Sequence, residues 1–173
     1  MGKHRVWIQT VILAALILVG GFAIGQSLFA GDKLPREGNK APAFSLQSMD
    51  QTSLALSDFK GKVVIVNFWG TFCSPCKEEM PALQKQYETW HDRGVEVLAV
   101  NLGESEVTVR SFVKQYGLTF PILYDPNLAI RDNYGVNQYP TTFFVDPNGK
   151  IKHVKIGEMD EAFIDQTLKE MRQ

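Results

Sequence analysis

The order of apolar and polar residues along the chain predicts alternating strands and helices, preceded by one long apolar segment. Residues 63–69 form an almost unbroken apolar block, which is typical of a parallel strand buried on both faces. Residues 95–100 form a second, mostly apolar block. From residue 77 to residue 93, apolar residues recur at three- and four-residue spacing, which predicts an amphipathic helix between the two strands.

The rest of the domain continues the same alternation. A short hairpin is expected at residues 44–56, where two apolar stretches flank a polar turn. Further strands are expected at residues 120–124, 141–145 and 151–156, and further helices at residues 107–116, 127–134 and 160–171. This order predicts an α/β fold in which helices flank a central mixed sheet.

The first 31 residues contain no acid and form the long apolar segment. The run from Val6 to Gly31 is uncharged and long enough to cross a bilayer with some tilt. Lys3 precedes it, so residues 1–5 are expected in the cytoplasm and the chain beyond residue 31 outside the membrane. We favour an uncleaved signal-anchor at residues 6–31 over a cleaved signal peptide, because Leu28 stands where a cleavage site needs a small residue.

Residues 32–40 are polar and contain proline and glycine, which predicts a tether to a single domain at residues 41–173. All 19 acids of the chain and 16 of its 18 bases lie beyond the apolar segment, so three more acids than bases are present there. Such a weak charge argues against a nucleic-acid partner. Nothing in the sequence indicates more than a monomer.

Chemistry is concentrated in Cys73 and Cys76, the only two cysteines of the chain, which directly follow the first strand. At the start of a helix, free N–H groups and the positive dipole end favour a thiolate on the first cysteine. Pro75 suits the first helical turn, where its missing N–H costs little. The spacing is typical of thiol–disulfide exchange, with Cys73 as nucleophile and Cys76 as resolving thiol. No metal or other cofactor is expected beyond the redox-active cysteine pair itself.

Two other interpretations of the pair are weaker. A structural disulfide stabilises a protein more when it closes a longer loop, so a three-residue span is a poor staple. A zinc site would need two more ligands, and the chain contains only three histidines, one of which precedes the apolar segment.

Four stretches follow one another in a characteristic order. They are Ala41-Pro42-Ala43-Phe44, Asn67-Phe68-Trp69 before Cys73-Ser74-Pro75-Cys76, an insertion beginning at Val100, and Tyr139-Pro140-Thr141-Thr142-Phe143-Phe144. Over roughly residues 35–173 the chain resembles the thioredoxin superfamily, and within it the membrane-anchored, extracytoplasmic ResA/TlpA-type thiol–disulfide oxidoreductases. The resemblance implies a thioredoxin-like fold with an extra N-terminal hairpin and, at residues 103–116, a helical insertion shared with peroxiredoxins.

The resemblance also implies roles for residues around the pair. Pro140 is expected to be cis, to lie against the cysteines and to leave the backbone at Tyr139 free for an extended substrate. Without the resemblance, Pro140 would be interpreted as a proline at a strand entrance. The function implied is reduction of the haem-binding cysteines of apocytochrome c, with electrons supplied by a CcdA-type membrane reductase.

Glu79 stands three residues after Cys76, so helical spacing places both on one face. Thioredoxins carry a buried acid where this chain has Asn67. We therefore hypothesise that Glu79 exchanges the proton of the resolving thiol, as the resemblance to ResA-like proteins implies for the matching glutamate. The alternative is a solvated helix glutamate.

Three further residues are candidates for supporting the site. Glu104 follows the strand at residues 95–100, and α/β sheets place their sites at the carboxyl ends of strands. Its alternative role is that of a loop acid that caps the next helix. Trp69 and Phe72 are expected to form an apolar rim around the cysteines that shields the thiolate.

Rival functions remain open at this point. A reductant of another envelope or sporulation client would differ only in its client. A DsbA-type oxidant would carry a large helical insertion, and a peroxidase would have its resolving cysteine far from the first. A copper-binding Sco-like assembly factor has three residues between its cysteines, whereas two separate them here, and His153 is the one histidine that could serve it.

Overall fold

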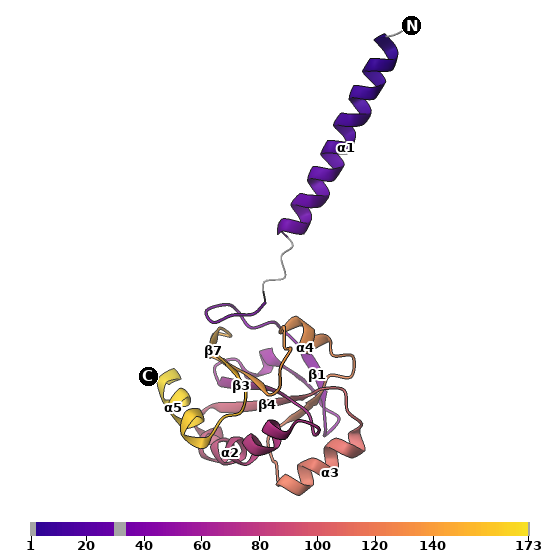
Figure 1. Ribbon diagram of the computed structural model, residues 1–173. Helices are drawn as coiled ribbons and strands as arrows, with labels where there is room; N and C mark the ends of the chain where they lie inside the picture. Colours follow the sequence, from indigo (N-terminus) through magenta and orange to yellow (C-terminus); the bar gives the residue numbers. More distant parts are fainter. Residues whose placement is uncertain (1–2, 30–33, 173) are drawn as a thin grey trace. The chain divides into compact units, whose positions relative to one another are not determined.

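The structure is a computed structural model that describes residues 3–29 and 34–172 (Figure 1). The chain divides into two compact units, Met1–Lys33 and Leu34–Gln173. The first unit contains one helix, α1 (Lys3–Phe29). Among the described residues, no helix is both long and apolar enough to cross a membrane. The predicted anchor at residues 6–31 ends in a stretch, residues 30–33, that lies outside the described part of the chain.

The second unit is built on a seven-stranded mixed sheet with the order β2-β1-β5-β4-β3-β6-β7. The strands are β1 (Ser45–Ser48), β2 (Ser53–Ala55), β3 (Val63–Trp69), β4 (Val95–Asn101), β5 (Ile122–Tyr124), β6 (Thr141–Val145) and β7 (Ile151–Ile156). β3 runs parallel to β4 and antiparallel to β6. The predicted α/β fold with a central mixed sheet is therefore confirmed.

Within residues 34–172, four α-helices and two 3-10 turns accompany the strands. They are η1 (Leu56–Phe59), α2 (Ser74–Trp90), η2 (His91–Arg93), α3 (Glu106–Tyr116), α4 (Ala129–Asn133) and α5 (Glu161–Met171). In Figure 1, α2 and α3 lie below the strands, α4 lies above them and α5 lies at their left. The N-terminal hairpin is β1 and β2, and α3 is the helix of the predicted insertion.

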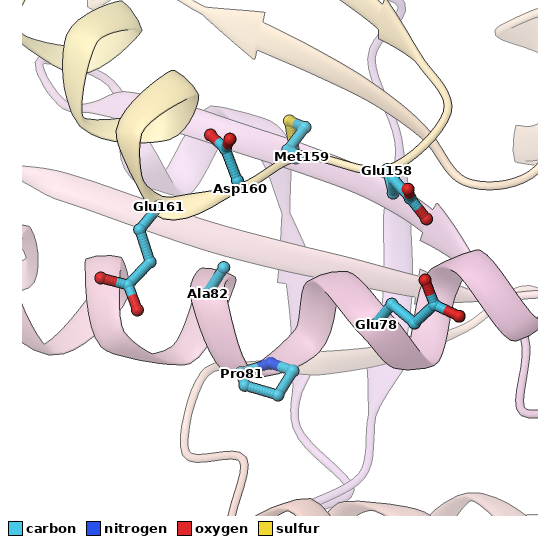
Figure 2. A pocket seen from close by; sticks show the side chains of 7 residues that line it. All are labelled: Glu78, Pro81, Ala82, Glu158, Met159, Asp160 and Glu161. Atoms are coloured by element: carbon cyan, nitrogen blue, oxygen red, sulfur yellow. The ribbon is translucent and has the colours of Figure 1, made fainter.

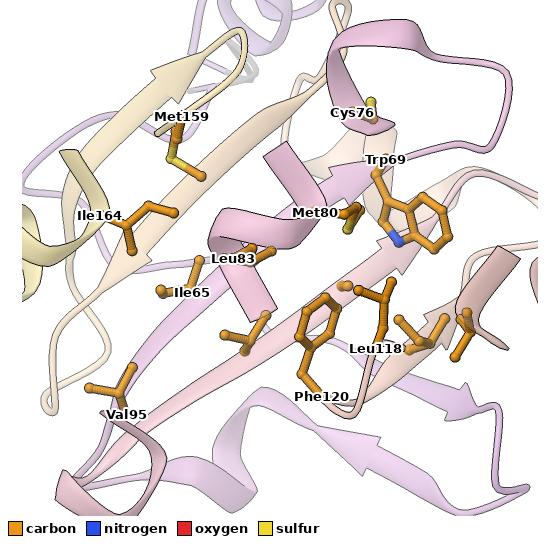
Figure 3. Packing of buried hydrophobic residues seen from close by; sticks show 14 of the residues in the cluster. Ile65, Trp69, Cys76, Met80, Leu83, Val95, Leu118, Phe120, Met159 and Ile164 are labelled. Carbon is orange, nitrogen blue, oxygen red and sulfur yellow. The ribbon is translucent and has the colours of Figure 1, made fainter. Parts of the chain in front are cut away.

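Two apolar clusters cover the two faces of the sheet, because successive side chains of a strand point to opposite faces. Every residue of β3 is buried. Ile65 and Trp69 pack with Met80 and Leu83 of α2, as Figure 3 shows. Val66 and its neighbours pack on the other face with Phe44 and Tyr134. A strand buried on both faces is held firmly, and it carries the cysteine pair at its carboxyl end.

Part of the predicted tether at residues 32–40 pairs with the last hairpin. The main-chain N–H of Gly38 donates to the carbonyl of Ile151, whose own N–H donates to the carbonyl of Asn39. Lys40 forms a β-bridge with Lys150. These contacts attach residues 38–40 to the edge strand β7.

Candidate active site

The two cysteines form a disulfide at the point where β3 passes into α2. The sulfurs of Cys73 and Cys76 are bonded, and their Cα atoms are 5.2 Å apart. Cys73 retains 7% of its surface exposed, whereas Cys76 is fully buried. Cys73 is therefore the sulfur that solvent or a partner reaches first.

Local backbone geometry explains this placement. Cys73 has extended backbone angles and caps α2, and its Sγ atom accepts a hydrogen bond of 3.2 Å from the N–H of Cys76. Pro75 occupies the first turn, where a missing N–H leaves no hydrogen bond unmade. The N–H groups of this turn and the helix dipole face the Cys73 sulfur, and both stabilise negative charge on it after reduction.

Glu79 is buried one turn further along α2, with 1% of its surface exposed. Its Oε1 atom accepts a hydrogen bond of 2.7 Å from Nδ2 of Asn67, which also donates to Thr142 at 2.9 Å. Its Oε2 atom makes no hydrogen bond within the described residues. Asn67 and Thr142 are thus the residues that sequence reasoning did not assign to the site. A polar residue within the apolar block 63–69 was the available signal, because a buried amide needs a partner.

Burial raises the pKa of Glu79 from 4.5 to about 7, because desolvation disfavours the charged carboxylate. The hydrogen bond from Asn67 and the nearby main-chain N–H of Met159 act in the opposite direction and lower the pKa. Glu158 raises it further by like-charge repulsion, and Lys155 lowers it. A carboxyl with a pKa near neutrality can both accept and release a proton under physiological conditions.

A groove of about 370 Å³ lies between α2 and the segment before α5, and Met159 is part of its lining. Figure 2 shows four carboxylates around it, from Glu78, Glu158, Asp160 and Glu161. Of these four, only Glu161 forms an ion pair within the described residues, with Lys85, whereas Asp160 caps α5 through a hydrogen bond. This flank of the site is therefore acidic.

The Tyr139–Pro140 peptide bond is cis, as the family resemblance implied. Pro140 is buried at the entrance of β6, and its carbonyl accepts a hydrogen bond from Gly157. Within residues 34–172, neither the N–H nor the C=O of the Tyr139 main chain is hydrogen bonded. The Tyr139 ring lies edge-on to Phe72, with ring centroids 6.3 Å apart.

The predicted apolar rim needs one correction. Phe72 is exposed, with 64% of its surface accessible, but Trp69 is fully buried and packs on Phe112 at a centroid distance of 4.9 Å. The reason is strand alternation, which turns Trp69 toward the α2 face of the sheet. Trp69 is a core residue, and Phe72 is the aromatic residue at the surface.

Glu104 reaches the active-site loop from the end of β4. Its carboxylate accepts hydrogen bonds from both the N–H and the hydroxyl of Thr71, at 2.7 and 2.5 Å. It also accepts one of 2.8 Å from Asn101. The cap of α3 is instead Ser105, whose hydroxyl accepts from the N–H of Thr108. Glu104 does not cap the next helix through its side chain.

The donor set offers no site for a metal among the described residues, where no group of three His, Cys, Asp or Glu side chains converges. His153 lies on β7 beside Glu37, at 3.7 Å. The chemistry that the geometry supports is therefore that of the disulfide and the buried carboxyl beside it.

Comparisons with known proteins point to the same chemistry. The model of the AhpC/TSA family matches residues 38–154, which is more than half of the chain. The thiol-disulfide oxidoreductase ResA of Bacillus subtilis (strain 168) is 44% identical over 162 residues, covering 94% of this chain and 90% of the relative. ResA of Halalkalibacterium halodurans is 39% identical over 164 residues, covering 95% and 93%.

The fold comparison agrees. A putative thiol:disulfide interchange protein DsbE from Chlorobium tepidum superposes with a TM-score of 0.73 at 31% identity. The match covers 79% of this chain and 99% of the solved chain. The second unit thus has a thioredoxin-like fold.

Proposed function

We propose that this chain, which belongs to the AhpC/TSA family and is a thiol–disulfide oxidoreductase of the ResA type, reduces the haem-binding cysteines of apocytochrome c outside the cytoplasmic membrane. The observation that carries the proposal is the Cys73–Cys76 pair at the start of α2, with a buried carboxyl one turn behind it. The chemistry follows from these residues, and the choice of client rests on the family resemblance.

The first step uses Cys73, the more accessible of the two cysteines. In the reduced protein the Cys73 thiolate attacks one sulfur of the client disulfide, and the other client sulfur leaves as a thiolate that takes up a proton. A mixed disulfide then joins Cys73 to the client. The unpaired main chain of Tyr139 supports this step, because an extended client segment can pair with it next to Cys73.

The second step releases the client. Cys76 loses its proton and attacks the Cys73 sulfur, so the second client cysteine leaves as a thiol and the protein disulfide forms. Two electrons pass to the client in all. We propose that Glu79 accepts the Cys76 proton, since its pKa of about 7 suits a base at neutral pH. A membrane reductase of the CcdA type would then restore the two thiols.

The proposed location rests on the sequence. Residues 6–31 carry no charge, and two bases, Lys3 and Arg5, precede them. We propose that this segment holds the domain at the outer surface of the membrane. Fractionation of the full chain tests it: recovery in the membrane fraction after a high-salt wash supports the tether, and release by salt contradicts it.

The direction of electron flow is tested by the reduction potential of the pair. Thioredoxin lies at about −270 mV and DsbA at about −120 mV, which differ by roughly 7 kcal/mol for a two-electron couple. We expect a value at or below the thioredoxin end. A value near that of DsbA would make the protein an oxidant and would contradict the proposal.

The role of Glu79 is tested by Glu79→Gln, with Glu78→Gln on the neighbouring exposed residue as the matched control. We expect the Glu79 variant to slow release of the mixed disulfide and to change the pKa of Cys76. Unchanged cysteine pKa values and an unchanged exchange rate would remove Glu79 from the mechanism.

A further inference from the structure

We propose that Glu104 is a positioning residue that fixes the loop before Cys73, so that Phe72 forms a rigid docking surface for an apolar side chain next to the client's disulfide. The inference rests on the proposed exchange function but not on the identity of the client. It assigns a role to a carboxylate that takes no part in the exchange steps themselves.

The contacts of Glu104 form a clamp. Three donors converge on its carboxylate, namely the N–H and hydroxyl of Thr71 and the side-chain amide of Asn101. Its own N–H donates to Oδ1 of Asn101 at 3.1 Å. Asn101 is fully buried at the end of β4 and is paired with Trp69 of β3. The clamp therefore ties the loop to the most firmly held part of the sheet.

The residue that follows Thr71 is held from two further directions. The ring of Phe72 lies over Gly70, where an added Cβ would meet its Cε1 atom at 2.4 Å. The edge of the same ring faces Tyr139. Single exposed apolar residues are common on protein surfaces and need no explanation. The Phe72 ring is different, because the Glu104 hydrogen bonds, the close approach to Gly70 and the Tyr139 ring hold it in place. Pre-organised aromatic side chains of this kind are common at binding surfaces.

The kind of partner follows from the position. Phe72 is adjacent to Cys73, so whatever covers the ring must also carry the disulfide that Cys73 attacks. The ring is uncharged and exposed, and burying it against apolar surface removes both surfaces from water, which is favourable. The structure thus points to a polypeptide client with an apolar side chain beside one of its cysteines. The contact between the Phe72 ring and this side chain exists only while the client is bound.

Substitutions can separate the effect of the Glu104 charge from that of its hydrogen bonds. Glu104→Ala removes both, Glu104→Gln removes the charge but keeps one acceptor, and Thr71→Val removes one donor while leaving the charge. Glu106→Ala is the matched control, because Glu106 is an exposed acid of the same segment that pairs with Arg110 on its own helix. The clamp account predicts losses in the order Ala, then Gln and Val, with none for the control.

The experiment measures steady-state reduction of two disulfide peptides and of a small hydrophilic disulfide by the full chain in detergent, with an added dithiol that re-reduces the Cys73–Cys76 pair after each turnover. One peptide carries leucine beside its cysteines and the other carries serine. For the leucine peptide we expect Glu104→Ala and Phe72→Ala each to raise KM about tenfold, with kcat unchanged. Thr71→Val should raise KM about threefold. Reduction of the small disulfide should remain within twofold of wild type.

A double-mutant cycle decides whether Glu104 acts through Phe72. If it does, the double variant loses no more than Phe72→Ala alone. Losses that multiply to about 100-fold would overturn the inference, and so would an equal loss with the small disulfide. If the wild-type chain reduces neither peptide, the proposed function itself is wrong. If the wild type reduces both peptides equally well, only the docking surface is wrong.

Discussion

Glu79 and Glu96 are two glutamates buried to nearly the same extent, with 1% and 3% of their surfaces exposed, and their partners differ. Glu96 is at the start of β4, where its carboxylate meets the ammonium of Lys62 at 3.2 Å and lies 3.7 Å from Nδ1 of His91. Glu79 lies behind the disulfide at the other end of β3. Its one side-chain donor is the neutral Asn67, and the main-chain N–H of Met159 is nearby.

This difference in partners distinguishes a carboxylate that serves stability, Glu96, from one that is suited to proton transfer, Glu79. A buried charge is tolerated when a cation and hydrogen bonds replace its water, and removing one partner of such a pair is costly. A buried carboxyl without a cation holds its proton more tightly, which is the condition for proton transfer near pH 7. Residue type and burial are the same, so the partners decide the role.

The largest expected effect comes from the sulfur chemistry at the Glu79 end. Cys73→Ser should lower the rate of disulfide reduction by at least about 10⁴-fold, or about 5.5 kcal/mol in transition-state free energy. The hydroxyl is far less nucleophilic than a thiolate. Stability, compared with the reduced wild type by urea unfolding, should change by less than about 1 kcal/mol, since the side chains are similar in size.

Cys76→Ser is the matched variant for that experiment. It keeps the nucleophile and lacks the resolving thiol, so the mixed disulfide with the client should accumulate and appear as a mass adduct. An adduct on Cys76 in the Cys73→Ser variant would reverse the assignment of the two sulfurs.

The second effect is a dependence of stability on pH that belongs to Glu79. Its pKa is about 7 in the folded protein against 4.5 ordinarily, so the folded state binds the proton more tightly than the unfolded chain. The stabilisation is complete below pH 4.5 and is lost as the pH rises through 7, by about 3 kcal/mol in all. Glu79→Gln should therefore match the wild type at pH 4 and exceed its free energy of unfolding by up to about 3 kcal/mol at pH 8.

Urea unfolding of the oxidised protein and of the Glu79→Gln variant, at several pH values between 4 and 8, checks this difference. Other groups titrate over the same range, but they are common to both proteins and cancel. Two parallel curves would mean that Glu79 is not raised in pKa in solution.

The part of the site around the cysteines and Glu79 could be predicted from the sequence largely because its signals are local. The apolar block 63–69, the spacing of the two cysteines and the helical spacing to Glu79 all lie within one strand and one helix. The cis peptide bond before Pro140 came from the family resemblance, since no local pattern requires it.

Other parts of the site depend on contacts between segments that are distant in the chain. The spacing of apolar residues does not predict such contacts. Glu104 and Thr71 are 33 residues apart, and their hydrogen bonds exist because β3 and β4 are adjacent in the sheet. Trp69 was expected to form, with Phe72, an apolar rim around the cysteines. The alternation of β3 places it in the core instead, in the same buried cluster as Cys73 and Cys76.

The third effect tests the Glu96 end. Glu96→Ala should lower the free energy of unfolding by about 2 kcal/mol, which is less than a fully buried pair would give, because 38% of the Lys62 side chain is exposed and can be hydrated. The rate of disulfide exchange should be unchanged. Glu96→Gln, which keeps the shape, should lose somewhat less stability. A slower exchange rate at full stability would show that Glu96 is coupled to the disulfide and would break the contrast between the two ends.

The smallest effect concerns Asn67, the side-chain donor of Glu79. Asn67→Ala removes a hydrogen bond that favours the ionised carboxylate, so the pKa of Glu79 should rise by about one unit above its present value, which corresponds to about 1.4 kcal/mol. The ¹³C resonance of the carboxyl carbon, followed through a pH titration of the oxidised protein, reports this shift. Thr142→Val is the control, because Thr142 accepts the other hydrogen of the same amide and does not bond to Glu79. If the pKa of Glu79 is unchanged in Asn67→Ala, the hydrogen bond from Asn67 does not contribute to the proton affinity of Glu79. The Asn67 amide would then serve only to join β3 to β6.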